Sequence, residues 1–139
     1  MGPSSHRVLV SGSDEYGLGR WVWTLYKGRN NTKLRVISGY RPNPDSTDRV
    51  ASVYSQHERY LRSKKDDRNP RRAFVKDLQA ALTTWKEEGD LFIIGMDAND
   101  NVRTGDVNAM LRIMGLVDVH CDKHPHLPTV LTCNKNTKG

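Results

Sequence analysis

Two stretches decide the fold: Leu-Arg-Val-Ile-Ser-Gly-Tyr-Arg-Pro-Asn at residues 34–43 and Leu-Phe-Ile-Ile-Gly-Met-Asp-Ala-Asn at residues 91–99. Each opens with apolar or β-branched residues, which favour a β-strand, and closes with polar residues, which favour a loop. The second opens with a continuous apolar run, residues 91–94, that is too short for a helix and predicts a strand buried on both faces. The sequence therefore predicts two strands whose exits carry polar side chains.

The chain before the first of these stretches predicts a hairpin. Residues 20–26 are rich in aromatic and β-branched residues, and a polar loop at residues 27–32 connects them to the strand at residues 34–40. Strands joined by so short a loop pair antiparallel. A short strand is also predicted at residues 7–10, with a turn-rich break at residues 11–14.

Two helices are predicted between the hairpin and the apolar strand. Thr47 or Asp48 can cap the first helix, which runs to about Ser63. Asn69-Pro70 combines a capping side chain with a proline suited to the first helical turn, and predicts the start of the second helix. Apolar residues recur at helical spacing in both segments, and Gly89 ends the second.

A third, short helix is predicted at residues 107–114, capped by Asp106. Strands alternating with helices define an α/β protein. We expect a mixed, mainly antiparallel sheet with flanking helices on one face.

Composition narrows the class of protein. The chain has 139 residues, a length typical of one domain, a net charge of +6 and a pI near 9.5. A basic protein favours phosphate-rich partners, although the charge also serves solubility. Its apolar runs are far shorter than the roughly 20 residues of a membrane helix, and no signal peptide is recognisable. We therefore expect an intracellular protein, nuclear or cytoplasmic, with no membrane partner and with its two cysteines reduced or incidental.

Polar residues at the two strand exits are the candidates for chemistry. Asp97 can orient or deprotonate water, while Asn99 can donate to a phosphoryl oxygen and hold the carboxylate. Tyr40, Arg41 and Asn43 lie on a proline-stiffened loop and could face a phosphate. The alternative interpretation is that these residues have no catalytic role. Asp and Asn are common in Asx turns at the ends of strands, Tyr40 would lie partly in the core, and Arg41 would be solvated.

Together these motifs resemble the endonuclease/exonuclease/phosphatase superfamily, in its retrotransposon-type and apurinic/apyrimidinic endonuclease-like branches. The order is a strand with Tyr-x-Pro-Asn, two helices, and an apolar strand with Asp-x-Asn. Four further segments are similar to that branch: Gly19-Arg20-Trp21, Tyr54-Ser55-Gln56, Asn69-Pro70-Arg71 and Gly115-Leu116-Val117-Asp118. Thr132 stands where the family often has a threonine–aromatic pair.

The resemblance implies a role for each matched residue. Tyr40 would contact the scissile phosphate, Asn43 would bond a phosphate oxygen, Asp97 would activate water, and Asn99 would orient Asp97. Arg41 and Thr132 would join Asn43 in binding substrate. The resemblance also implies part of a four-layer sandwich, Mg²⁺ or Mn²⁺ as cofactor, and metal-dependent hydrolysis of phosphodiesters in nucleic acid, most plausibly DNA.

The resemblance covers residues 17–139 and leaves residues 1–16 as a leader without a family counterpart. The family's metal-binding Glu and its carboxyl-terminal Asp and Asp-His pair have no counterpart, and Gly95-Met96-Asp97 is one residue longer than the family's Gly-Asp. We therefore expect an incomplete or truncated catalytic domain. The alternatives are a non-catalytic remnant, a nucleic-acid-binding module of the same fold, or a phosphatase of that fold.

Other patterns have competing interpretations. One cluster contains residue types that bind zinc: His120, Cys121, His124, His126 and Cys133. It is either a zinc site or a polar loop in which the histidines occur by chance. A nucleic-acid face is weighed against a solvated helix connection for the basic residues between 59 and 72. Trp21, Trp23 and Trp85 are expected in the core rather than stacking on bases. Because part of a sandwich leaves apolar sheet surface open, we also expect self-association.

Overall fold

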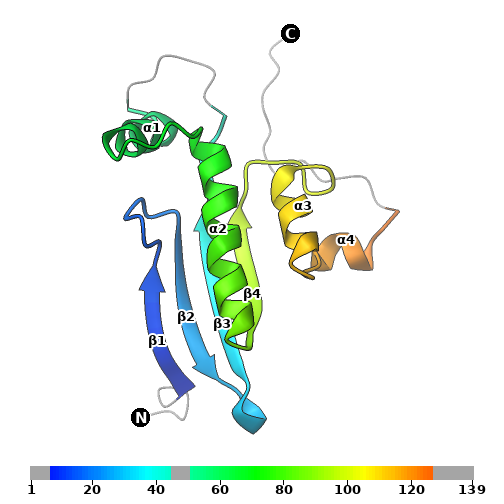
Figure 1. Cartoon of the computed structure of the whole chain (residues 1–139). Coiled ribbons are helices and arrows are strands. Elements are labelled where there is room, and N and C mark those ends of the chain that lie inside the picture. The colour runs from blue at the N-terminus through cyan, green and yellow to red at the C-terminus, as the bar shows by residue number, and fades with distance from the viewer. Residues whose placement is uncertain (1–6, 45–50, 127–139) are drawn as a thin grey trace. The chain divides into compact units, whose positions relative to one another are not determined.

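Four strands form one mixed sheet in the order β1-β2-β3-β4 (Figure 1). Their bounds are Val8–Ser13 for β1, Trp21–Lys27 for β2, Lys33–Tyr40 for β3 and Asp90–Asp97 for β4. β1–β2 and β2–β3 pair antiparallel, and β3–β4 pair parallel. The expected α/β class and the mainly antiparallel mixed sheet are confirmed.

The structure is a computed structural model that describes residues 7–44 and 51–126. Two compact units are present, Met1–Asn99 and Asp100–Gly139. The first contains the sheet with helices α1 (Val53–Ser63) and α2 (Pro70–Glu87), and the second contains α3 (Asp106–Ile113) and α4 (Val119–Lys123). In the described residues, no helix is both long and apolar enough to cross a membrane.

The β2–β3 hairpin forms as the sequence predicts. Its loop contains a short 3₁₀ turn, Arg29–Asn31, in which Asn30 and Asn31 have positive φ angles of 54° and 60°. Asparagine tolerates this left-handed conformation better than most residues because its short side chain bonds locally. The asparagines of this loop therefore suit its left-handed backbone conformation as well as its exposure to solvent.

The first strand is longer than predicted. Residues 11–13, expected to be a break, continue β1 and pair with β2, with Gly12 opposite Trp23. A Cβ atom on residue 12 would overlap the Trp23 indole, so glycine is needed here for close approach rather than for a turn. The glycine between two serines led to the prediction of a turn, because its packing against Trp23 cannot be inferred from the local sequence.

Both long helices begin at capping side chains. Asn69 Oδ1 accepts from the backbone N–H groups of Arg71 and Arg72 at 2.9 and 3.4 Å, as predicted for the start of α2. Helix α1 ends at Ser63 as predicted, but it begins at Val53 with Ser52 as its cap, and Thr47 and Asp48 lie outside the described residues. The cap of α3 is Gly105 rather than Asp106, and α4, capped by Asp118, was not predicted.

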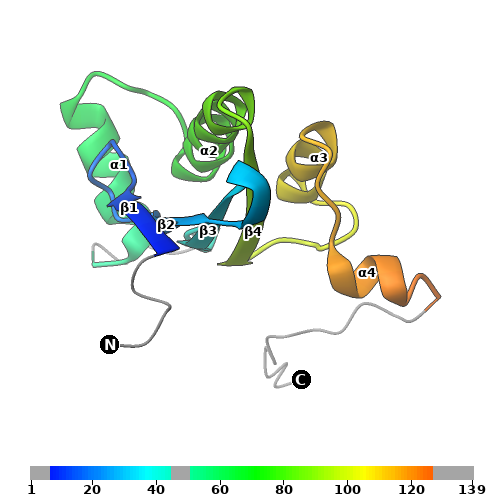
Figure 2. The same ribbon diagram turned by 90° about the horizontal axis from the view of Figure 1, so that it is seen from below.

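The core lies between α2 and one face of the sheet (Figure 2). Trp21 and Phe74, both buried, meet edge to face at 5.6 Å between ring centroids. Trp23 and Trp85 meet in the same way at 5.5 Å. The expectation of a core position is confirmed for Trp21, whereas Trp23 and Trp85 are half-buried.

Two arginines are buried in this core with carboxylate partners. Arg20 bonds Asp14 and Asp77, at 2.5 Å to Asp14 Oδ2 and 2.8 Å to Asp77 Oδ2. Arg35 bonds both a carboxylate and aromatic rings: its Nε and Nη2 lie 2.9 and 2.7 Å from Asp90 Oδ2. Its guanidinium carbon lies 4.1 and 4.2 Å from the ring centroids of Trp23 and Trp85. Paired charges of this kind tolerate burial because each finds hydrogen-bond partners.

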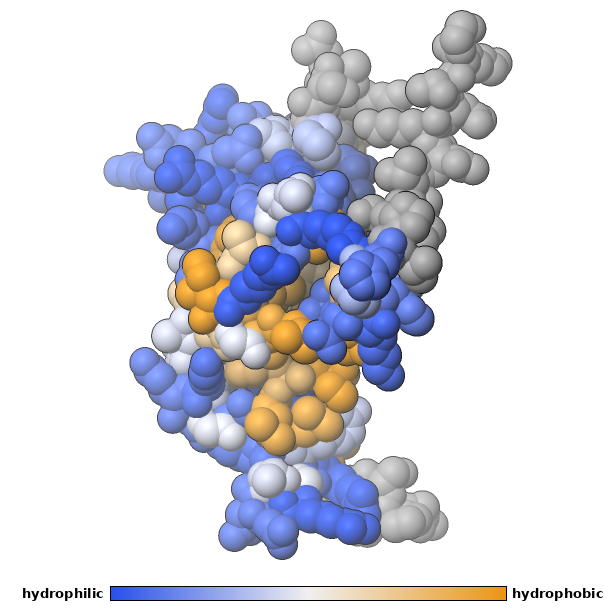
Figure 3. All heavy atoms as spheres, turned by 90° about the vertical axis from the view of Figure 1, so that its right-hand side faces the viewer, coloured by the Kyte–Doolittle hydropathy of each residue, from blue (hydrophilic) through white to orange (hydrophobic). Residues whose placement is uncertain are grey.

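The opposite face of the sheet is exposed, which contradicts the prediction that residues 91–94 are buried on both faces. Leu91 and Ile93 are each 57% exposed and Val22 is 54% exposed. Figure 3, which views the molecule from the right-hand side of Figure 1, shows hydrophobic atoms in the middle of the face that is turned toward the viewer. The apolar run is therefore half-buried, because α2 covers only the face that carries Phe92 and Ile94.

Candidate functional site

The candidate site lies where β3 and β4 end. These strands are parallel and in register, so Tyr40, the last residue of β3, is opposite Asp97, the last residue of β4. Side chains alternate between faces along a strand, which places both residues on the open face of the sheet. Tyr40 is 38% exposed, and the Asp97 side chain is also exposed. Both side chains are accessible to a ligand.

Asn99 reaches Asp97 through its backbone rather than through its amide. The Asn99 N–H donates to Asp97 Oδ1 at 3.2 Å in an Asx turn. The residue has a positive φ of 45°, and its side-chain Nδ2 donates to the Arg41 carbonyl at 2.7 Å. The resemblance implies that Asn99 orients Asp97, and in the structure the contact between the two residues is made by the Asn99 backbone N–H.

Arg41 is turned away from solvent. It is 2% exposed, and its Nε and Nη2 donate to the Arg71 carbonyl at 3.3 and 3.1 Å. Its own N–H donates to the Asp97 carbonyl at 2.9 Å. The alternative of a solvated Arg41 is wrong, and a direct contact with substrate would require this guanidinium to leave its buried position.

The remaining candidates divide between surface and core. Asn43 is exposed beside the site, whereas Pro42 before it is fully buried and stiffens the loop. Thr132 lies outside the described residues. The structure thus brings together Tyr40, Asn43, Asp97 and Asn99 at one end of the sheet.

Arg71 is the residue at this site that sequence reasoning did not assign. It follows Pro70 at the start of α2, and its Nη1 and Nη2 donate to the carbonyls of Pro42 and Asn99 at 2.6 and 2.9 Å. In the sequence it was one cation among several in a basic run. Only the fold reveals that its helix start lies against both strand exits.

The donor set at this site does not complete a magnesium site. Mg²⁺ prefers six oxygen ligands and takes at least one or two of them from carboxylates. Asp97 supplies the carboxylate here, and within residues 7–44 and 51–126 no group of three or more His, Cys, Asp or Glu side chains is placed to hold a metal ion. The Mg²⁺ or Mn²⁺ that the resemblance implies is thus not accommodated by the described residues alone.

Some of the basic residues between 59 and 72 form ion pairs with carboxylates. Arg62 pairs with Glu58 at 3.0 Å, and Arg68 binds Asp66 and Asp77 at 2.6 and 2.8 Å. Several others in the first unit are exposed cations: Arg59, Lys64, Lys65 and Arg72. The segment therefore serves both as a structural connection and as a positive surface.

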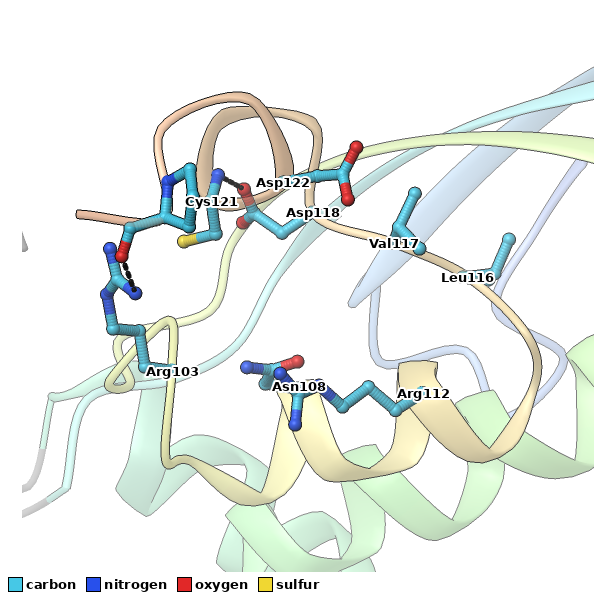
Figure 4. A pocket seen from close by; sticks show the side chains of 9 residues that line it. Arg103, Asn108, Arg112, Leu116, Val117, Asp118, Cys121 and Asp122 are labelled. Carbon is cyan, nitrogen blue, oxygen red and sulfur yellow. Dashed lines mark hydrogen bonds between the residues drawn. The ribbon is translucent and has the colours of Figure 1, made fainter. Parts of the chain in front are cut away.

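The second unit holds a cavity of about 300 Å³ between α3 and α4 (Figure 4). Arg103, Asn108 and Arg112 line one part, and Asp118, Cys121 and Asp122 another. The Cys121 N–H donates to Asp118 Oδ1 at 2.8 Å, and Arg103 donates to the Pro125 carbonyl at 3.3 Å. Because two arginines and two aspartates line the cavity, its charge favours neither an anionic nor a cationic ligand.

The histidine and cysteine cluster gives no metal geometry in the described residues. His120 and His124 approach with ring centroids 5.2 Å apart, and Cys121 is a free thiol. Cys133 lies outside the described residues. The polar-loop interpretation accounts for His124 and His126, whereas His120 and Cys121 lie in α4.

Comparison with known proteins finds partial structural likeness. No family model and no curated protein matches the chain. A structure of a beta-hairpin deletion mutant of beta toxin from Staphylococcus aureus is 18% identical with a TM-score of 0.42, over 71% of this chain and 30% of the toxin chain. Another beta toxin structure, described as 275-280, is 15% identical with a TM-score of 0.46, over 81% and 38% of the respective chains. The chain therefore spans about a third of the length of the toxin structures it resembles.

Proposed function

We propose that this chain carries the phosphate-binding part of a phosphodiesterase site that acts on nucleic acid, with DNA as the first candidate. The observation that supports the proposal is the pairing of Tyr40 with Asp97 at the last position of the parallel β3–β4 ladder. Two polar side chains presented side by side on an exposed surface can engage one small group at the same time. The family resemblance of the surrounding segments favours a phosphodiester as that group.

Each residue has a chemical role in this proposal. The Asp97 carboxylate accepts a hydrogen bond from an attacking water and takes its proton. The Tyr40 hydroxyl donates to a phosphoryl oxygen, where negative charge grows as the water attacks. The exposed Asn43 amide holds a second phosphate oxygen. Efficient hydrolysis needs further metal-binding oxygens, so the site is expected to work slowly until these are supplied.

Nucleic acid is the substrate class that the charge favours. Exposed cations along the connection from α1 to α2 can neutralise successive phosphates of a backbone, and each contact releases bound counterions. A small phosphorylated substrate would have little use for cations spread along a connection. The same surface supports a second candidate function, nucleic-acid binding without hydrolysis.

The test is nicking of supercoiled plasmid by the purified chain with Mg²⁺ or Mn²⁺. Asp97→Ala removes the candidate carboxylate, and Asn99→Ala removes the side-chain amide that bonds the Arg41 carbonyl. Asp67→Ala removes an exposed carboxylate elsewhere, with the same change in charge as Asp97→Ala. Nicking that needs the metal, disappears in the first two variants and persists in the third would support the proposal. Nicking that all variants share would reveal a contaminant.

Binding of a fluorescent duplex oligonucleotide, measured by anisotropy across a salt series, separates the two candidates. Binding that weakens steeply with salt, in the absence of nicking, would favour the binding module. Neither binding nor nicking, combined with turnover of a small phosphomonoester that Asp97→Ala abolishes, would favour the phosphatase alternative.

A further inference from the structure

The carbonyl oxygens at the two strand exits are held by one side chain from a third element. Arg71 belongs to the first turn of α2, and its Nη1 and Nη2 lie 2.6 and 2.9 Å from the carbonyl oxygens of Pro42 and Asn99. Its own carbonyl accepts from the buried Arg41 guanidinium. The two arginines thus bind each other's segments reciprocally.

The hydrogen bonds form a continuous path through the candidate site. From Arg71 the path passes to Asn99, from the Asn99 amide to the Arg41 carbonyl at 2.7 Å, and from the Arg41 N–H to the Asp97 carbonyl at 2.9 Å. The Asn99 N–H closes the path on the Asp97 carboxylate. The position of Asp97 therefore depends on the backbone at residue 99.

Residue 99 needs such support because its backbone is in the left-handed region, with φ at 45°. A residue other than glycine in this region persists when its surroundings determine its conformation. The bond from Arg71 holds the Asn99 carbonyl, and the bond from the Asn99 side-chain amide to the Arg41 carbonyl holds the side chain.

We propose that Arg71 is a positioning residue, which holds Asn99 and through it sets the direction of the Asp97 carboxylate. Both terminal nitrogens of its guanidinium donate to main-chain carbonyls, and it acts on Asp97 through those atoms. Lysine can replace it only in part, because a single ammonium group lacks the planar fork that reaches two carbonyls together. This inference rests on the proposed function for its catalytic consequence, but its structural part is independent of activity.

The test uses the full chain and three variants: Arg71→Ala, Arg71→Lys and, as a matched control, Arg72→Ala. Arg72 is the neighbouring cation and is exposed, and because it belongs to the positive surface it is the control for the exchange readout alone. The first readout is amide hydrogen exchange by nuclear magnetic resonance at Arg41, whose N–H is bonded to Asp97. The reference is the Leu25 amide in the centre of the β2–β3 hairpin.

We expect Arg71→Ala to accelerate exchange at Arg41 by at least tenfold and to shift the Asn99 side-chain amide resonances, with exchange at Leu25 unchanged. Arg71→Lys should give an intermediate effect, and Arg72→Ala none. Unchanged exchange and resonances in Arg71→Ala would overturn the positioning role. Equal acceleration at Leu25 would also overturn it, because the effect would then be general destabilisation.

The second readout is plasmid nicking. Positioning predicts that Arg71→Ala lowers the maximal rate by at least tenfold and leaves the plasmid concentration for half-maximal rate within about threefold. An unchanged maximal rate, in a chain whose wild-type form nicks, would overturn the catalytic consequence. If the exchange result holds but the wild-type chain neither nicks nor binds DNA, the positioning of Asp97 stands and the proposed function fails.

Discussion

Tyr40 and Asp97 end their strands at the same level of the parallel ladder, and each points to the face of the sheet that α2 leaves open. Parallel strands place their carboxyl ends at one edge, which is where ligands gather in open α/β sheets. The pairing also explains the extra residue before Asp97. Met96 continues the ladder opposite Gly39, so the strand carries the carboxylate one position further before the turn begins.

Tyr40→Phe tests the role of the phenol. Because Tyr40 lies at the surface, loss of its hydroxyl should leave the midpoint of urea unfolding unchanged. Loss of one donor to a developing oxyanion lowers the maximal rate by roughly 10²-fold in comparable sites, and we expect a similar loss in plasmid nicking. Tyr26→Phe, on the same face near the other end of the sheet, is the control; an equal loss there would remove Tyr40 from the mechanism.

Arg20→Met tests the buried ion pairs. Arg20 is 1% exposed and binds two carboxylates that are also buried. Removing one partner of a buried pair leaves uncompensated charge and costs about 3–5 kcal/mol, which urea unfolding followed by circular dichroism would measure. Arg62→Ala breaks an exposed pair with Glu58 and should cost less than about 1 kcal/mol. Similar losses of stability in the two variants would show that the buried ion pairs contribute no more than the exposed pair.

The stability of the fold should depend on pH through His57. Burial, and then the positive charge of Arg20, lower the pKa of His57 below its ordinary value of 6.5. The folded state therefore resists a proton that the unfolded chain accepts, so the free energy of unfolding should fall as the pH drops through 6.5 and level off below the folded pKa. Arg68 lowers the pKa of Asp66, but that contribution is lost only below the ordinary value of 3.8, outside this range.

The measurement is the urea midpoint at pH 7.5 and pH 5.5 for the wild type and His57→Gln. Glutamine retains a donor for the Leu18 backbone but does not titrate. We expect the wild type to lose stability at the lower pH and the variant to lose less. Equal pH dependence in both would assign the effect to other groups.

Asn69 makes two separable contacts at the start of α2. Its Oδ1 caps the helix, and its Nδ2 donates to the Tyr54 hydroxyl at 2.6 Å. Asn69→Ala removes both contacts and should cost about 1 kcal/mol or more. Asn69→Asp retains the cap acceptor and loses the donor, so thermal unfolding should place it between the wild type and Asn69→Ala.

The open face of the sheet predicts self-association. Ile93 and Leu91 expose apolar surface, and a second copy of the chain can cover it. Ile93→Lys should reduce the average mass in analytical ultracentrifugation at high concentration with little change in stability. A wild type that stays monomeric at all concentrations would contradict the prediction.

The sequence predicted the hairpin, the start of α2 and the placement of Asp97 at a strand exit, because each follows from local chemistry. Asn69-Pro70 is an example: cap and proline act within one turn of helix. The sequence did not predict the extent of β1 or the exposure of β4. These depend on Trp23 packing over Gly12 and on which faces find a covering layer.

At the site, residue identity was easier to predict than orientation. Asp97 and Asn99 follow an apolar strand, which sequence reveals, but the inward turn of Arg41 is set by the Arg71 carbonyl from a distant helix. A contact between segments far apart in the chain cannot be predicted from the local sequence of either segment.

Arg35, which packs against both Trp23 and Trp85, lies on the same strand as Tyr40 but near the opposite end of that strand. At about 3.3 Å per residue, the two positions on β3 are roughly 16 Å apart. Substitutions separated by more than about 10 Å usually have additive effects on stability. The two ends of β3 therefore have separate roles: the end with Arg35 stabilises the fold, and the end with Tyr40 carries the candidate site. Substitutions at the Tyr40 end can accumulate during evolution without loss of the contacts that Arg35 makes.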